Sequence, residues 1–203
     1  MRLTLTAEMT VEIDKIKGSR FIGIARPCAT AQDAELWSQE LWERYSDARH
    51  VCWAHRGAHP DHVRYVDDGE PSGTAGKPIL TVIEGLGLES SAVAVVRYFG
   101  GTKLGTGGLA RAYSASTQAV LAASPIQELL LRAQVTITTA YSFESTLMYL
   151  LSQHDAEVLS RDYQAEVTVI AILTEAEADA LCAQVIERTA NRAQITRGDS
   201  YWG

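Results

Sequence analysis

The sequence has little of what secreted and membrane proteins need. Its 203 residues include only three cysteines, Cys28, Cys52 and Cys182, which are odd in number and far apart. They therefore do not form the paired framework of a small disulfide-rich domain. No apolar run approaches the ~18 residues needed to cross a membrane, and the polar, alternating N-terminal residues lack the apolar core of a signal peptide. These absences predict a cytoplasmic protein that does not associate with a membrane.

Acidic residues are missing from two long stretches, 15–32 and 90–127, although the whole chain has a net charge of −7. The deficit of positive charge lies elsewhere, because residues 127–203 carry five basic and eleven acidic side chains. An acidic total argues against non-specific binding of polyanions by the whole surface. The two acid-free stretches still allow a local cationic patch, with scattered solvated side chains as the alternative.

Apolar patterning predicts a mixture of strands and helices in the first part of the chain. Two alternating segments flank a Gly18–Ser19 turn and predict a hairpin. Thr30 forms a capping-box-like start for one helix, and Ser72 or Thr74 is expected to cap another. The expected elements are strands at 10–18, 19–28, 50–57, 63–68 and 91–99, and helices at 30–46, from 72 or 74 to 84, and at 107–123.

The remainder has the order βαββαβ, which is typical of a ferredoxin-like domain. Ser142 is expected to cap its first helix, and Thr174 with Glu177 its second, which is expected to end near Asn191. The expected strands are 129–141, 156–164, 165–173 and 193–202. Because the pattern breaks at Pro125, the sequence predicts two domains, residues 1–125 and 126–203.

The segment VVRYFGGTKLGTGGLARAYS, residues 95–114, is the first candidate site. Closely spaced glycines let backbone amides converge on an anion, and the start of the following helix adds partial positive charge. The alternative is a tight turn that packs a helix against its strand. The candidate residues for binding phosphate or nucleic acid are Arg97, Gly100, Gly101, Lys103, Gly105, Gly107, Gly108 and Arg111.

The segment DDGEPSGTAGKP, residues 67–78, is the second candidate. Its three carboxylates are of a type that binds Mg²⁺ or acts in acid–base catalysis. Asp-Gly and Glu-Pro are also turn chemistry, and a following Ser or Thr caps a helix, so a structural role is favoured. The secondary candidates are Arg20, Asp67, Asp68, Glu70, Ser72, Thr74 and Lys77.

Other cofactor motifs are weak. Pro71 stands where a Walker loop requires glycine, and GTGGLA at 105–110 matches a dinucleotide pattern without the repeated βαβ order that such a site needs. Cys52, His55, His59 and His62 lie on one expected strand and its turn, whereas structural zinc sites usually pair ligands from separated segments. No metal, cofactor or catalytic residue is expected.

Three segments together carry a resemblance to a known family. SRF at 19–21, the DDGEPSGTAGKP segment and the glycine-rich segment resemble the YigZ/Impact family, as does HVCWA at 50–54. The resemblance implies a bacterial two-domain member of α+β class. Its N-terminal domain would be an α/β sandwich like a domain of a ribosomal protein, and its C-terminal domain would be ferredoxin-like and similar to a domain of elongation factor G. It also implies a link to translation, and it brings no catalytic residue.

Two functions are consistent with these features. The first is a cytosolic, non-catalytic binding protein, associated with translation, whose glycine-rich basic loop contacts RNA or ribosomal phosphate. Its acidic C-terminal domain would contact a protein partner. The alternative is an enzyme that acts on a small phosphorylated metabolite or nucleotide with Mg²⁺.

Overall fold

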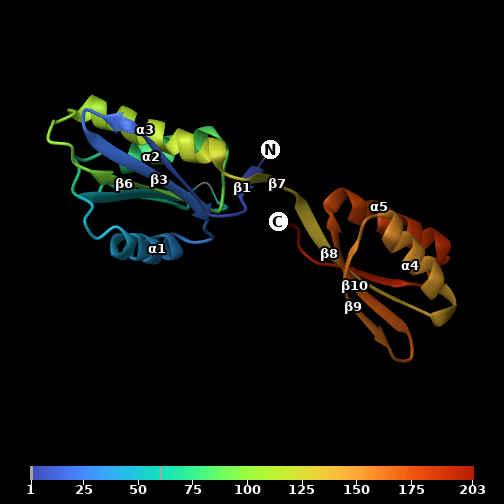
Figure 1. Ribbon diagram of the computed structural model, residues 1–203. Coiled ribbons are helices and arrows are strands. Elements are labelled where there is room, and N and C mark those ends of the chain that lie inside the picture. Colours follow the sequence, from blue (N-terminus) through green and yellow to red (C-terminus); the bar gives the residue numbers. More distant parts are fainter. Residues whose placement is uncertain (1, 60) are drawn as a thin grey trace. The chain divides into compact units, whose positions relative to one another are not determined.

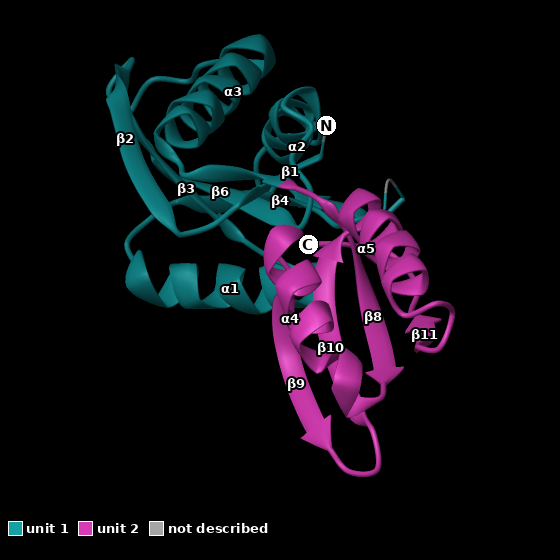
Figure 2. Cartoon of the chain, turned by 90° about the vertical axis from the view of Figure 1, so that its right-hand side faces the viewer, with its two compact units in different colours: residues 1–128 teal, residues 129–203 magenta. Residues whose placement is uncertain are grey.

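The computed structural model describes residues 2–59 and 61–203, and the chain forms two compact units (Figure 1). The first comprises residues 1–128 and the second residues 129–203 (Figure 2). The two units confirm the predicted α+β class. Within the described residues, no helix is both long enough and apolar enough to cross a membrane.

The first unit is built on a five-stranded sheet with helices on both faces. The strand order is β2-β3-β6-β4-β5, and each neighbouring pair is antiparallel. Figure 2 shows α1 on one face and α2 and α3 on the other. The elements are β2 (Met9–Ile16), β3 (Ser19–Pro27), α1 (Ala31–Arg44), β4 (His50–Arg56), β5 (Val63–Val66), α2 (Gly76–Gly85), β6 (Ser91–Tyr98) and α3 (Thr106–Ala123).

The central strand β6 is apolar along its length because helices cover both of its faces. Val93 and Val95 belong to the core beneath α2 and α3. Ala94 and Val96 belong to the core beneath α1. The predicted cap of α1 is confirmed, because the Thr30 hydroxyl accepts a hydrogen bond from the Asp33 amide at 3.1 Å. The apolar run that indicated a buried strand therefore sits at the centre of the sandwich.

One pairing was not anticipated from the sequence. The N-terminal strand β1 (Arg2–Leu5) pairs with β7 (Ile126–Leu129) in a separate two-stranded sheet. The Thr6 amide also donates to the Pro125 carbonyl at 3.1 Å. The first unit thus extends through this strand to Glu128.

The second unit has the predicted βαββαβ order. Its sheet has the strand order β11-β8-β10-β9, and α4 and α5 cover one face (Figure 2). In β8 only alternate residues, such as Val135 and Ile137, face the core. The elements are β8 (Leu131–Thr139), η1 (Tyr141–Phe143), α4 (Glu144–Gln153), β9 (Glu157–Tyr163), β10 (Val167–Thr174), α5 (Glu175–Arg188), β11 (Gln194–Arg197) and β12 (Tyr201–Trp202).

Two local predictions in the second unit are wrong. Ser142 does not cap α4, because it lies inside a 3₁₀ turn and Phe143 occupies the capping position. The expected strand at 193–202 is divided into β11 and β12. The predicted cap of α5 is confirmed, since the Thr174 hydroxyl accepts from the Glu177 amide at 3.3 Å.

His55 is a buried, neutral histidine in β4. Its Nε2 lies 3.1 Å from the Cys28 carbonyl and donates to it, and its Nδ1 has no partner among the described residues. A charged ring would therefore carry a buried N–H without an acceptor. Burial lowers the pKa of His55 below its ordinary value.

Stability should therefore decrease below neutral pH. The unfolded chain takes up this proton near the ordinary histidine pKa of 6.5, whereas the folded chain takes it up only at lower pH. The contribution of neutral His55 to stability is therefore fully present above pH 6.5 and is lost as the pH falls below that value. Between pH 7.5 and 5.5 the free energy of unfolding in urea should fall by at most about 1.4 kcal/mol from this residue. His55→Gln should remove that part of the pH dependence, and an unchanged slope would contradict the assignment.

Gly100, after the end of β6, packs directly on Gly18 in the β2–β3 turn. Replacing Gly100 tests this contact. A Cβ on Gly100 would lie 1.9 Å from the carbonyl carbon of Gly18, whereas one on Gly101 would meet nothing within 4 Å. Gly100→Ala should cost about 3 kcal/mol or more in urea unfolding because backbone must move. Gly101→Ala is the matched control and should cost about 1 kcal/mol, from its φ of 86° alone. Equal losses would contradict the contact.

Candidate functional site

The two acid-free stretches meet at one edge of the first unit. Strand β3 pairs with β6 so that Arg20 lies opposite Tyr98. This register carries Gly18, before β3, onto Gly100, after β6, in direct backbone contact. The basic residues of the β2–β3 turn and of the glycine-rich loop are therefore brought to the same region.

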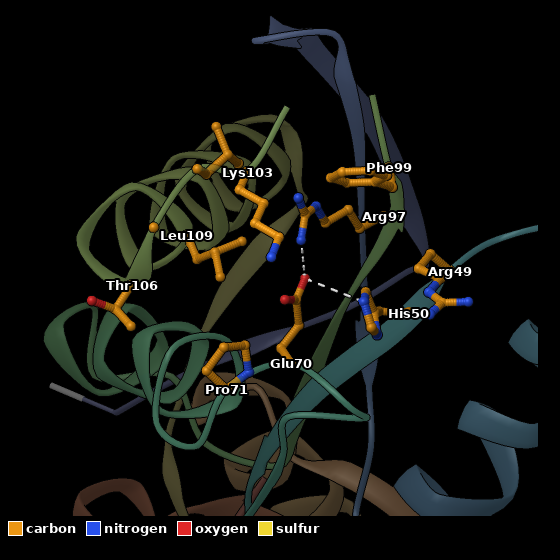
Figure 3. A pocket seen from close by; sticks show the side chains of 11 residues that line it. Arg49, His50, Glu70, Pro71, Arg97, Phe99, Lys103, Thr106 and Leu109 are labelled. Carbon is orange, nitrogen blue, oxygen red and sulfur yellow. Dashed lines mark hydrogen bonds and ion pairs between the residues drawn. The ribbon is translucent and has the colours of Figure 1, made fainter. Parts of the chain in front are cut away.

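A cavity of about 410 Å³ lies beside this contact (Figure 3). Four parts of the chain line it: the start of β4, the DDGEP segment, the end of β6, and the loop that leads into α3. The lining residues are Arg49, His50, Glu70, Pro71, Arg97, Phe99, Lys103, Leu104, Gly105, Thr106 and Leu109. The cavity joins both segments that the sequence singled out.

An ion pair between Glu70 and Arg97 stands at the centre of this cavity (Figure 3). Arg97 Nη1 donates to Glu70 Oε1 at 2.5 Å, and the two side chains are only 5% and 4% exposed. The Tyr113 hydroxyl donates to the same oxygen at 2.9 Å. Burial raises the pKa of Tyr113, which keeps this hydroxyl protonated as a donor. The Arg97 guanidinium also lies 5.5 Å and 5.7 Å from the ring centres of Phe21 and Phe99.

His50 is held against this pair from β4. Its Nδ1 lies 2.7 Å from the Asp68 carbonyl, which only accepts, so Nδ1 carries a proton. Its Nε2 faces Glu70 Oε1 at 3.7 Å. The imidazole is therefore oriented by backbone on one side and faces a carboxylate on the other.

The carboxylates of the DDGEP segment have separate structural tasks. Asp67 accepts from the amides of Gly73, Ala75 and Gly76 at 2.7–2.9 Å, so it caps α2. Asp68 accepts from the Val51 amide at 2.6 Å. Both carboxylates are thus engaged by backbone away from the cavity, whereas Glu70 lines it.

The hydroxyl residues of this segment do not cap α2, contrary to prediction. Asp67 supplies the acceptor, and the Thr74 hydroxyl instead donates to the Pro71 carbonyl at 2.6 Å. Ser72 and Lys77 are exposed and do not line the cavity.

The five glycines of the loop serve different purposes. Gly100 packs on Gly18, and Gly101 has a positive φ at an exposed position. Gly105, with a φ of 73°, precedes α3 and lines the cavity, and Gly107 and Gly108 form the first turn. Among the described residues no side chain caps α3, and its first turn contains no acid. The helix start therefore keeps its unpaired amides and partial positive charge.

The basic candidates also separate. Lys103 lines the cavity beside the buried Arg97. Arg111 lines a neighbouring hollow with Lys17, and Leu104 borders both. Arg20 is bound to Glu12 through two hydrogen bonds of 2.8 Å and 2.9 Å, which lower the pKa of Glu12. Arg20 is thus already paired with a carboxylate.

Several residues at the site were not singled out as candidates from the sequence. Arg49 immediately precedes β4 and His50 begins it, Tyr113 comes from α3, and Lys17 comes from the β2–β3 turn. Lys17 lies in the first acid-free stretch, and this position could have identified it as a candidate from the sequence. The remaining three reach the site through long-range packing that periodicity does not report.

The cysteine and histidines of β4 do not converge on a metal. Cys52 faces the core beneath α2 and α3, where burial raises its pKa, while His55 lies on the opposite face of the strand. In the described part of the chain no group of three or more His, Cys, Asp or Glu side chains is arranged to hold a metal ion.

Comparisons with known proteins agree with this architecture. Residues 17–121 match the Impact N-terminal domain, and residues 126–192 match a domain of unknown function, DUF1949. The IMPACT family member YigZ of Escherichia coli (strain K12) is 34% identical over 195 residues, covering 95% of this chain and 92% of that protein. An IMPACT family member of Haemophilus influenzae is 32% identical over 185 residues, 90% of each chain.

A solved structure has the same fold. The crystal structure of a hypothetical protein is 32% identical, with a TM-score of 0.65, and the match covers 96% of this chain and 95% of that one. The resemblance inferred from the quoted segments is confirmed: this chain belongs to the IMPACT family.

Proposed function

We propose that this protein is a cytoplasmic, non-catalytic RNA-binding protein, associated with translation, that contacts RNA phosphates through its first unit. The contact surface is the basic face, which we define as Lys17, Arg49, Lys103 and Arg111. All four residues are exposed and border the two adjoining hollows at the glycine-rich loop. Ribosomal RNA is a source of such phosphates.

The observation that carries this proposal is that the basic face lacks carboxylate partners. Among the residues that the structure describes, no Asp or Glu forms an ion pair with any of its four members, whereas many other cations of the first unit are paired. The paired residues are Arg2, Arg20, Arg44, Arg56, Arg64 and Arg97. Cations without protein partners are available to phosphate oxygens, and such contacts dominate the affinity for nucleic acid.

Phe99 adds a second feature of RNA-binding surfaces. Its side chain is 50% exposed and lies beside the cations of the cavity (Figure 3). Unpaired bases stack on exposed aromatic rings, which favours single-stranded RNA over a duplex. The pairing of a ring with flanking cations therefore fits a single strand whose backbone follows the basic face.

The second unit is suited to a different partner. Residues 129–203 have five basic and ten acidic side chains, a net charge of −5, which repels a phosphate backbone. Two half-exposed tyrosines of this unit, Tyr141 and Tyr163, stack with their ring centres 6.5 Å apart. We assign contact with a protein partner to this unit.

Neutralising three members of the basic face should weaken RNA binding and reduce its dependence on salt. In the variant Lys17→Gln/Lys103→Gln/Arg111→Gln, each lost phosphate contact should reduce the slope of log affinity against log salt concentration by about 0.7 for single strands. Fluorescence anisotropy with a labelled single-stranded RNA at several salt concentrations measures both quantities. Arg97 is left intact, because its removal would strand the buried Glu70 carboxylate.

The matched control removes the same charge from the second unit. The variant Arg161→Gln/Arg188→Gln/Arg192→Gln changes three exposed arginines and should bind RNA within about twofold of the parent, because salt screens charges that do not contact the strand. If the two triple variants lose affinity equally, or if the parent shows no binding at low salt, the proposal is wrong.

A further inference from the structure

We propose that the cavity around Glu70 and Arg97 binds the phosphate monoester of a nucleotide, either at the end of an RNA strand or free in solution. The inference deepens the proposed function, on which its RNA-end form rests. It concerns which phosphate the site selects: a terminal monoester, not the diester along the backbone.

Charge in the cavity favours a dianion. Arg49, Arg97 and Lys103 contribute three positive charges and Glu70 contributes one negative charge, so these four side chains have a net charge of +2. A phosphate monoester carries about −1.5 to −2 at pH 7, whereas a diester carries only one negative charge. The start of α3, uncapped by side chains in the described structure, adds partial positive charge through Gly105 and Thr106 at the wall.

Arg97 has more donors than the protein uses. Its guanidinium is 5% exposed and has five N–H groups. Nη1 donates to Glu70 at 2.5 Å and Nη2 reaches Ser19 Oγ at 3.4 Å, but Nε finds no acceptor among the described residues. Nε is covered, so a ligand in the cavity would meet the terminal N–H groups, which number four and have two acceptors here. Phosphate oxygens match their geometry.

Lys103 is placed to act with Arg97. Figure 3 shows its ammonium group directed toward the Glu70–Arg97 pair, from the opposite wall. Lys103 has no carboxylate partner within the described chain. An anion between the two side chains would therefore be contacted by both.

Glu70 and Phe99 favour a ligand that carries a sugar and a base in addition to its phosphate. Its Oε1 accepts from Arg97 and Tyr113, whereas no described residue donates a hydrogen bond to Oε2. This second oxygen can accept from a hydroxyl of the ligand, as carboxylates do for ribose in nucleotide sites. The exposed ring of Phe99 offers a surface for a base. A volume of about 410 Å³ is within the range of small-molecule sites.

The test compares two RNAs of one sequence, with a 5′-phosphate or a 5′-hydroxyl, and uses AMP and adenosine as competitors. Fluorescence anisotropy should show about tenfold or tighter binding of the phosphorylated strand, as expected for an added charge-assisted contact. AMP, and not adenosine, should remove that preference. Direct calorimetric titration with AMP measures the free nucleotide independently of RNA.

Two double variants with equal loss of charge locate the effect. Arg49→Gln/Lys103→Gln changes the cavity and should reduce the preference for the 5′-phosphate to within about twofold. Lys17→Gln/Arg111→Gln changes the neighbouring hollow. It should weaken the binding of both RNAs equally and leave the ratio of their affinities unchanged. Both variants change exposed side chains, so folding is checked by thermal unfolding.

Each outcome is decisive for the inference. A 5′-phosphate preference that depends on Arg49 and Lys103 supports a strand end as the source, and AMP binding without such a preference supports a free nucleotide. If both RNAs bind equally and AMP does not bind, the inference is wrong while RNA binding stands. If AMP binds and neither RNA does, the proposed function fails and the monoester site stands.

Discussion

The buried ion pair between Glu70 and Arg97 is the constraint on which the site depends. It joins the DDGEP segment to the end of β6 at 2.5 Å, and Tyr113 of α3 donates to the same oxygen. Removing one partner of such a pair typically costs about 3–5 kcal/mol, because the other charge is left buried. Glu70 and Arg97 therefore fix the cavity wall, and the exposed Arg49 and Lys103 remain available to a ligand.

The two conspicuous segments of the sequence form a single structure. Asp67 caps α2, Asp68 binds the backbone of β4, and Glu70 pairs with Arg97 of the strand that leads into the glycine-rich loop. The turn of the acidic segment and the wall of the cavity thus belong to one structure. The acidic segment builds the frame, and its third carboxylate is the member that enters the cavity.

Patterns within short segments of the sequence predicted much of this fold. Contacts between residues far apart in the sequence could not be predicted in this way. The spacing of apolar residues identified the helices and the strands of both sheets, because the buried side chains of a helix or strand recur with the period of that element. It did not reveal the pairing of β1 with β7, since two four-residue strands far apart in sequence carry no turn signal. The loop glycines and Lys103 were recognisable as a possible anion site. That Arg20 is neutralised by Glu12, and that Arg49 completes the cavity, depends on contacts between strands that no local pattern encodes.

We propose that RNA phosphate contacts the glycine-rich loop at the start of α3. Two-dimensional ¹H–¹⁵N NMR during titration with a short single-stranded RNA tests it directly, because the loop supplies its own reporters. We expect the amide signals of Gly105, Gly107 and Gly108 to shift progressively and saturate, and the signal of Gly198 in the second unit to stay in place. Saturable binding that shifts Gly198 and leaves the three loop glycines unmoved would contradict it.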